Sequence, residues 1–211
     1  SRTEEANMMP NDIPANLAYA TRPLEGETCG GDACGWWQNA HRLVLAVADG
    51  LGHGVEASQA SQAALACIAT HLQETLETLF ENCNVALRHT RGAALAIAII
   101  DAKTQQVSVG CVGNIRVQWI HQQRIYRLDG ARGIVGGGYG RVVPEIRTLS
   151  AGDRLVMFSD GLDDCLPLLS FFATCADLSV QRQTETLIER WARSDDDASA
   201  LIYEHHFEQQ P

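Results

Sequence analysis

Between Ala93 and Phe158 the chain is a close succession of short apolar or alternating runs. Turn-forming residues separate the runs, which cover residues 93–100, 106–112, 116–120, 124–128, 142–149 and 154–158. Consecutive strands joined by so few residues pair antiparallel, because a parallel pair needs a long crossover connection. This stretch therefore predicts an antiparallel meander, and it limits the fold to one that is built on antiparallel sheets.

Segments of helical character lie on both sides of the meander. Residues 55–80 contain neither Gly nor Pro, and their Ala and Leu residues recur mostly at helical spacing, which predicts one long helix, with a second over 81–89. Residues 162–193 are again helical in composition, with an interruption at Pro167. Buried strands are expected at 41–48 and 198–203. The order predicts an α+β fold, a sandwich of two antiparallel sheets flanked by helices.

The length and composition indicate one soluble domain. With 45% apolar and 20% charged residues, the 211-residue chain is ordinary for a globular protein, which disfavours disorder. We expect residues 21–211 to form a single domain and residues 1–20 to form an N-terminal arm. No run approaches the roughly 18 apolar residues of a membrane span, and the first residues do not form a secretory signal.

Charge and cysteine content restrict the partners and the compartment. The net charge of −10, without a basic stripe, disfavours a nucleic-acid partner. The seven cysteines form no CxxC pair, and several lie in apolar segments. We interpret them as reduced core residues rather than a disulfide framework, which indicates a cytoplasmic protein.

Two Asp-Gly pairs each follow an apolar strand. Asp49-Gly50 opens the segment ADGLGHG, and Asp160-Gly161 ends the segment FSDG. Alone, the first is equally well a capping turn or a phosphate-cradling loop, although the Lys of a Walker loop is missing. Two aspartates delivered to the same kind of sheet edge cannot both stay ionised at short distance without a cation. Oxygen ligands favour magnesium or manganese.

Two further acidic segments lie beside apolar runs. They are Gly30-Gly31-Asp32 and the triplet Asp195-Asp196-Asp197, which is followed by Ala198-Ser199. Read singly, each is more typical of a turn or a solvated loop. Together the four segments supply carboxylates from distant parts of the chain, namely Asp32, Asp49, Asp160 and Asp196 or Asp197.

The motifs GGD, ADGLGHG, FSDG and DDAS, in this order, resemble those of the PPM-type metal-dependent serine/threonine phosphatases. More narrowly they resemble the SpoIIE/RsbU branch. The segments Thr90-Arg91-Gly92-Ala93 and CVGNIR, residues 111–116, are similar to the RsbX-like stressosome phosphatases. The resemblance runs from about Cys29 to Tyr203.

The resemblance implies an α-β-β-α sandwich that holds two divalent cations, Mn²⁺ or Mg²⁺, and a catalytic water activated by both. Asp49 would bridge the two ions, the Gly50 carbonyl would bind one, and Asp160 and Asp196 would bind the other. Asp32 would hold metal-bound water, so the implied catalytic residues are Asp49, Asp160 and Asp32. Aligning Ser199 with the threonine of the family motif selects Asp196, with Asp195 and Asp197 as open alternatives.

Other positions depart from the family pattern or invite two interpretations. Leu51 occupies the position of the histidine that animal relatives use as a general acid, so His53 is either that acid or a loop-to-helix contact. Arg22 and Arg116 are candidates for binding phosphate. Residues 136–140 (GGGYG) form either a mobile flap or the end of a hairpin.

Two adjacent pairs are interpreted as structural. His205-His206 is expected in a solvated tail, because neighbours on a strand point to opposite faces and cannot easily share a metal. Trp36-Trp37 is expected to place one ring in the core and one at the rim, although a recognition surface is the alternative.

The resemblance implies a protein serine/threonine phosphatase. Its substrates would be phosphorylated STAS-domain proteins of the stressosome, with neither a nucleic acid nor a membrane as partner. A catalytically weak, phosphatase-like binding protein is the alternative. A metal-dependent nuclease or nucleotidase is less favoured, because the chain is acidic and has no base-stacking platform.

Overall fold

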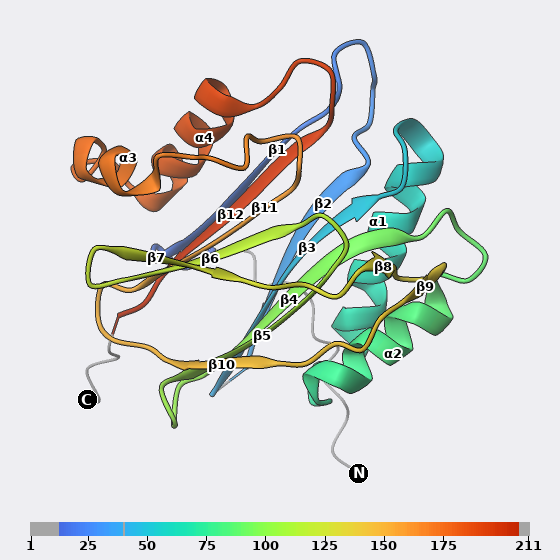
Figure 1. Ribbon diagram of the computed structural model, residues 1–211, viewed down its shortest axis with the longest axis horizontal. Coiled ribbons are helices and arrows are strands. Elements are labelled where there is room, and N and C mark those ends of the chain that lie inside the picture. Colours follow the sequence, from blue (N-terminus) through green and yellow to red (C-terminus); the bar gives the residue numbers. More distant parts are fainter. Residues whose placement is uncertain (1–12, 40, 207–211) are drawn as a thin grey trace.

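A computed structural model describes residues 13–39 and 41–206 of the chain. It contains two five-stranded sheets packed face to face, with helices on both outer sides (Figure 1). All pairs of neighbouring strands in these sheets are antiparallel, so the predicted α-β-β-α sandwich is confirmed.

Each sheet collects strands from distant parts of the chain. The strands of the first sheet are, in spatial order, β1 (Leu17–Arg22), β12 (Ala198–Glu204), β11 (Arg154–Phe158), β6 (Arg116–His121) and β7 (Arg124–Leu128). Those of the second sheet are β10 (Glu145–Thr148), β5 (Gln106–Val112), β4 (Ala93–Asp101), β3 (Arg42–Gly50) and β2 (Asp32–Gln38). A separate small hairpin pairs β8 (Gly133–Ile134) with β9 (Gly138–Tyr139).

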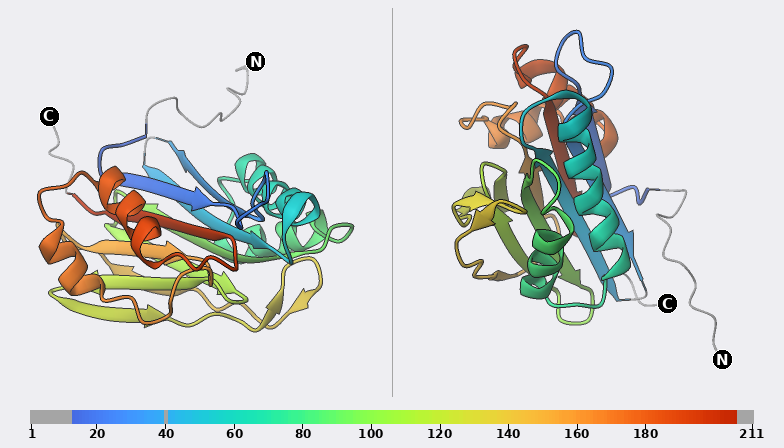
Figure 2. Two further views of the ribbon diagram at one scale, coloured as in Figure 1. Left: turned by 90° about the horizontal axis from the view of Figure 1, so that it is seen from above. Right: turned by 90° about the vertical axis from the view of Figure 1, so that its right-hand side faces the viewer.

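Two helices cover each outer face. The helices α1 (Gly54–Thr70) and α2 (Leu76–Ala86) pack on the second sheet, and α3 (Leu168–Thr174) and α4 (Val180–Trp191) lie on the side of the first sheet (Figure 2). Within the described residues, no helix is both long and apolar enough to cross a bilayer.

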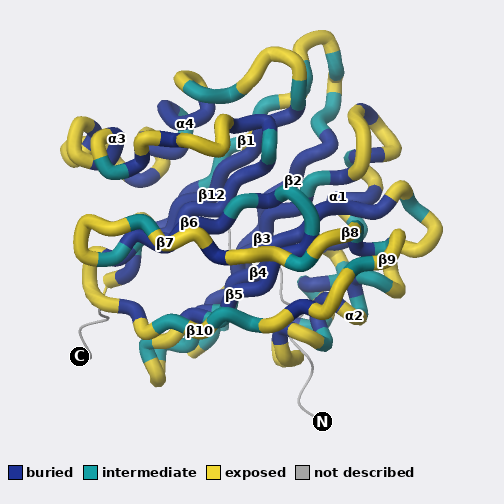
Figure 3. The backbone as a smooth tube through the Cα atoms, viewed as in Figure 1, coloured by how far each residue is buried: buried dark blue, intermediate teal, exposed yellow. Residues whose placement is uncertain are grey.

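The four layers enclose three apolar clusters. On β3, Leu45 and Val47 face the first sheet, whereas Val44 and Ala46 face the helices, as the period of two in a strand requires. Both faces of the central strands are therefore buried (Figure 3). This explains why the segment before Asp49 is continuously apolar rather than alternating.

The predicted helix over residues 55–80 is wrong in its extent. The chain leaves the helix after Thr70 and starts α2 at Leu76, where the Thr75 side chain accepts a hydrogen bond from the Thr78 backbone N–H at 3.3 Å. Threonine is a favoured N-cap, and Thr75 begins the second helix, five residues after the first has ended. The break was hidden because Leu72 stays buried and keeps the apolar spacing.

The predicted arm of residues 1–20 is too long, and its boundary falls inside β1. Leu17 pairs with Tyr203 and Ala20 with Ala200, so the segment is an edge strand of the first sheet. Residues 1–12 lie outside the described part of the chain. The predicted strand over 142–149 shortens to β10, which starts directly after Pro144, a residue with no N–H to donate to a ladder.

The prediction for the tryptophan pair is also wrong, because both rings are buried. Trp36 lies in the cluster between the sheets, and Trp37 lies in the cluster between the second sheet and its helices. Consecutive residues of β2 face opposite sides, and both sides are covered.

Candidate metal centre

Two of the predicted carboxylates form a cross-strand pair. Asp32 begins β2 and lies directly opposite Asp49 near the end of β3. Opposite residues of an antiparallel pair have Cβ atoms about 5 Å apart, so the two negative charges repel one another. Burial raises the pKa of Asp32 to about 6. Burial, followed by the charges of Asp32, Asp160 and Asp196, raises the pKa of Asp49 to about 8.

The first sheet brings two more carboxylates to the same end of the sandwich. Asp160 follows β11 and Asp196 precedes β12, and these strands are antiparallel neighbours, so the end of one lies beside the start of the other. Asp49, Asp160, Asp195 and Asp196 line a cavity of about 560 Å³. Burial and then the charge of Asp160 raise the pKa of Asp196. The convergence of Asp49 and Asp160, which the sequence predicts, is observed.

Hydrogen bonds hold these carboxylates in place across the two sheets. The Ser159 hydroxyl donates to Asp32 Oδ2 at 2.5 Å, and it accepts from the Ser199 backbone N–H at 3.0 Å. The Asn114 amide donates to Asp160 Oδ2 at 2.6 Å. Ser159 belongs to the motif FSDG and Asn114 to CVGNIR, but the sequence alone indicates no role for either residue. Both orient a carboxylate of the site.

The acidic triplet separates into three different environments. Asp197 is buried, and its two oxygens accept from the backbone N–H groups of Leu24 at 2.6 Å and Gly31 at 2.7 Å. Asp195 is exposed and pairs with Arg193. Asp195 and Asp196 both line the cavity, but Asp195 is held by Arg193, whereas Asp196 is near enough to Asp160 to feel its charge. The geometry therefore favours Asp196 among the three alternatives.

Both Asp-Gly motifs need glycine for the same physical reason. A Cβ on Gly50 would lie 1.9 Å from the Ala57 carbonyl oxygen of α1, and one on Gly161 would lie 1.8 Å from the Asp197 carbonyl oxygen. In each motif, another segment of backbone packs directly against the residue that follows the aspartate. The repeated Asp-Gly pattern therefore reflects two close contacts between backbone segments, one at the end of β3 and one just after β11.

The sequence candidates for binding phosphate have other partners. Arg22 donates to the backbone carbonyls of Ala192 and Arg193, and Arg116 forms a two-pronged ion pair with Asp164 at 2.8 and 3.1 Å. Neither lines the cavity.

Two cationic or potentially cationic residues do line it. His53 has its Nδ1 2.9 Å from Glu27 Oε1, which is the loop contact that was one of its two interpretations. Arg132, which sequence analysis missed, is exposed and has no hydrogen bond or ion pair from its side chain to the described residues.

Arg132 is brought there by the glycine-rich segment. This segment forms the β8–β9 hairpin, so the hairpin alternative of the sequence analysis is confirmed. The backbone groups of Val135 pair with those of Ala93, the first residue of β4, and anchor the hairpin beside the cavity. A Cβ on Gly136 would lie 2.7 Å from the Leu87 Cβ, which explains one of the glycines.

The donor set fits a hard divalent cation. Carboxylates offer only oxygen ligands, which hard divalent cations prefer. Burial, followed by repulsion from neighbouring carboxylates, raises the pKa of Asp49, so a bound cation would stabilise its charged form. Across residues 13–39 and 41–206, no three His, Cys, Asp or Glu side chains already form a ready-made ion site. Asp49 from the second sheet and Asp160 and Asp196 from the first instead line one cavity and could hold a cation there.

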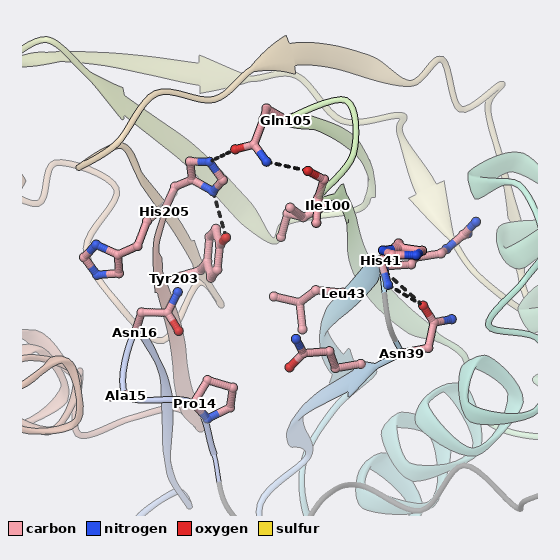
Figure 4. A pocket seen from close by; sticks show the side chains of 14 residues that line it. Pro14, Ala15, Asn16, Asn39, His41, Leu43, Ile100, Gln105, Tyr203 and His205 are labelled. Atoms are coloured by element: carbon pink, nitrogen blue, oxygen red, sulfur yellow. Dashed lines mark hydrogen bonds between the residues drawn. The ribbon is translucent and has the colours of Figure 1, made fainter. Parts of the chain in front are cut away.

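A second cavity, of about 390 Å³, is lined by the segment before β1 and by residues at the ends of β2, β3, β4 and β12, and it is shown in Figure 4. His205 is buried there, with Nδ1 2.9 Å from the Tyr203 hydroxyl and Nε2 2.7 Å from Gln105 Oε1. The predicted solvated tail is therefore wrong for His205, whereas His206 is exposed. Among the described residues, no carboxylate lines this cavity, so it lacks the carboxylate ligands of the first.

Comparison with known proteins decides the family. The family model described as Stage II sporulation protein E (SpoIIE) matches residues 39–206. The chain belongs to the SpoIIE family.

A curated SpoIIE-family relative is the phosphoserine phosphatase RsbX of Bacillus subtilis (strain 168). It is 30% identical over 142 residues, which are 66% of this chain and 70% of RsbX. This relative agrees with the predicted class of protein serine/threonine phosphatase.

Solved structures agree with the SpoIIE-family fold. A structure from a study of the bacterial stressosome as a modular system adapted to control secondary messenger signaling has 30% identity and a TM-score of 0.84, covering 89% of this chain and 97% of its own. RsbX in complex with magnesium has 23% identity and a TM-score of 0.77, with coverages of 89% and 94%. The predicted PPM phosphatase fold is confirmed.

Proposed function

We propose that the chain hydrolyses phosphoserine and phosphothreonine on proteins, with two divalent cations, Mn²⁺ or Mg²⁺, bound in the acidic cavity. The observation that carries this proposal is the convergence of Asp49 and Asp160 from different sheets on one cavity, with Asp196 beside them. The relatives support it, since one is a phosphoserine phosphatase and one was solved with magnesium.

In this proposal the residues of the chain have distinct tasks. Asp49 and the Gly50 carbonyl would hold cations from the second sheet, and Asp160 and Asp196 would hold them from the first. Asp32, opposite Asp49 on β2, would act through water. When bound, the cations supply the positive charge that lowers the pKa of a water nucleophile and neutralises the phosphoryl oxygens.

Arg132 would bind the phosphate of the substrate. Its guanidinium is an exposed cation at the wall of a cavity that otherwise carries four carboxylates. A guanidinium can donate two parallel hydrogen bonds to a phosphoryl group. Its freedom from other partners in the described residues leaves these donors available.

For the substrate we propose the phosphorylated STAS-domain proteins of a stressosome, in the cytoplasm. The support is the likeness to RsbX and to the structure from the stressosome study. A phosphorylated STAS-domain protein should therefore be dephosphorylated faster than a short phosphoserine peptide at equal concentration. Equal rates for the two substrates would contradict the proposed substrate class but not the proposed phosphatase activity.

The activity itself is tested by phosphate release from a phosphoserine peptide. We expect release to require added Mn²⁺, to stop in excess EDTA, and to fall more than about 100-fold in Asp49→Asn and Asp160→Asn. Asp177→Asn, which removes an exposed carboxylate between α3 and α4, is the matched control and should retain full activity. Undiminished release in EDTA refutes the mechanism. Metal-dependent peptide binding without release favours the alternative, a phosphatase-like binding protein.

A further inference from the structure

Two cysteines meet where α1 packs against α2, on the outer side of the sheet that carries Asp49. Cys67 lies on α1 and Cys83 on α2, and both belong to the apolar cluster beneath these helices. The Cys83 thiol donates to the carbonyl oxygen of Ala64 at 3.8 Å. Ala64 and Cys67 are three residues apart and therefore lie on the same face of α1. The Cys83 sulfur, which contacts Ala64, thus packs against the helix face that carries Cys67.

The two thiols differ in access to solvent and in acidity. Cys83 is fully buried, whereas Cys67 is half-buried and has the imidazole Nδ1 of His71 3.9 Å from its sulfur. A hydrogen bond with Cys83, helped by His71 and opposed by burial, lowers the pKa of Cys67 to about 7. The same hydrogen bond, together with burial, raises the pKa of Cys83. The pair is thus an accessible thiolate beside a buried thiol.

We propose that Cys67 and Cys83 form a redox site in which a peroxide oxidises Cys67 and Cys83 then closes a disulfide between α1 and α2. The Cys67 thiolate attacks one peroxide oxygen, the O–O bond breaks, and hydroxide leaves with a sulfenic acid remaining on Cys67. The Cys83 sulfur attacks the Cys67 sulfur, the S–O bond breaks, and water leaves. Two thiols and one hydrogen peroxide give one disulfide and two waters.

The other cysteines lack this arrangement. All seven lie in the described part of the chain and all are free thiols. Cys34 and Cys111 are buried, and burial raises the pKa of each. Cys165 is exposed. Cys67 combines a lowered pKa, a neighbouring thiol and partial access to solvent. These three properties together are typical of an oxidisable cysteine.

The disulfide would fasten the two helices behind the strand that ends at Asp49. α1 is the helix whose Ala57 carbonyl lies against Gly50, so it supports that end of β3 directly. The bridge would close a loop of about 15 residues, a length at which disulfides commonly stabilise a fold. We expect oxidation to raise Tm by about 5 °C or more. This inference does not depend on the proposed phosphatase activity.

The test treats the reduced full-length chain with a small molar excess of hydrogen peroxide at pH 7.5, blocks free thiols, and maps the peptides by mass spectrometry. No Lys or Arg lies between the two cysteines, so trypsin leaves both in one peptide. A protease that cleaves after glutamate separates them, because Glu74, Glu77 and Glu81 intervene. We expect a Cys67–Cys83 cross-link that disappears on reduction.

Three variants complete the test. Cys83→Ser should stop at a sulfenic acid on Cys67 that dimedone traps, Cys67→Ser should leave Cys83 reduced, and Cys165→Ser, the control, should retain the cross-link. The wild-type chain alone keeps the test decisive if a variant fails to fold. The proposal is overturned if Cys67 stays reduced while Cys165 is oxidised. It is also overturned if Cys67 is oxidised to sulfinic acid without forming the cross-link.

Discussion

Replacing Asp49 by Asn should stabilise the metal-free protein at alkaline pH. In the folded chain the pKa of Asp49 is raised to about 8, against 3.8 for an ordinary aspartate. Between these values the folded state holds a proton that the unfolded state releases, so the free energy of unfolding falls as pH rises from about 4 to about 8. Each pH unit of full linkage is worth 1.36 kcal/mol, which sets a ceiling of about 4 kcal/mol between pH 5 and pH 8.

The expected gain is smaller than this ceiling, because Asp32 takes up part of the proton that Asp49 would otherwise hold. We expect Asp49→Asn to exceed the wild type by about 2 kcal/mol at pH 8, or about 4–8 °C in Tm, and to match it at pH 5. Mn²⁺ should raise the Tm of the wild type more at pH 8 than at pH 5, since binding requires deprotonated ligands, and should not raise that of the variant.

The assay is thermal unfolding in EDTA and in Mn²⁺ across pH 5 to 8. Asp177→Asn removes an exposed carboxylate far from the cavity lining and controls for the change in net charge. If the wild type keeps the same Tm difference from Asp49→Asn at every pH, burial and the neighbouring charges do not raise the pKa of Asp49, and the reasoning is refuted.

Three further predictions concern other parts of the site. Asp197→Ala should lower stability by about 3 kcal/mol in denaturant unfolding, because the buried N–H group of Gly31 and the partly buried N–H group of Leu24 lose a charged acceptor. Asp195→Ala should leave stability unchanged, and equal effects would contradict the separation of the triplet. Gly161→Ala should yield little folded protein by circular dichroism, since its Cβ would overlap the Asp197 carbonyl, and a native spectrum would count against that close approach. Arg132→Ala should raise KM for a phosphoserine peptide and Ki for inorganic phosphate about 10-fold, Arg124→Ala should change neither, and unaltered constants in Arg132→Ala would remove it from phosphate binding.

The layered fold was predictable because its signals are local. The short turns between β4 and β5 and between β6 and β7 join antiparallel pairs, as predicted, whereas Gly113-Asn114 connects β5 to β6 in the other sheet and interrupts the predicted meander. The unbroken apolar run before Asp49 reflects a strand buried on both faces. The break before Thr75 was not predictable from spacing, because Leu72 keeps the apolar register through the turn. The pairing of β1 with β12 joins residues at opposite ends of the chain, and no local pattern encodes it.

The acidic site was predictable in part. Asp49 and Asp160 each precede a glycine that is required because another backbone segment packs against it. The resulting Asp-Gly pairs can be recognised in the sequence. The choice among the acidic triplet depends on the Leu24 and Gly31 backbone N–H groups, more than 160 residues away, which occupy Asp197. Arg132 reaches the cavity through hairpin packing, and its own neighbours in sequence do not indicate that role.

The central claim is that carboxylates from both sheets share bound cations, and crystals soaked in Mn²⁺ test it most directly. We predict anomalous-difference peaks between the carboxylates of Asp49, Asp160 and Asp196, and their loss in crystals of Asp49→Asn. Density for manganese only elsewhere on the molecule, or no peak in this cavity at millimolar Mn²⁺, would contradict the account.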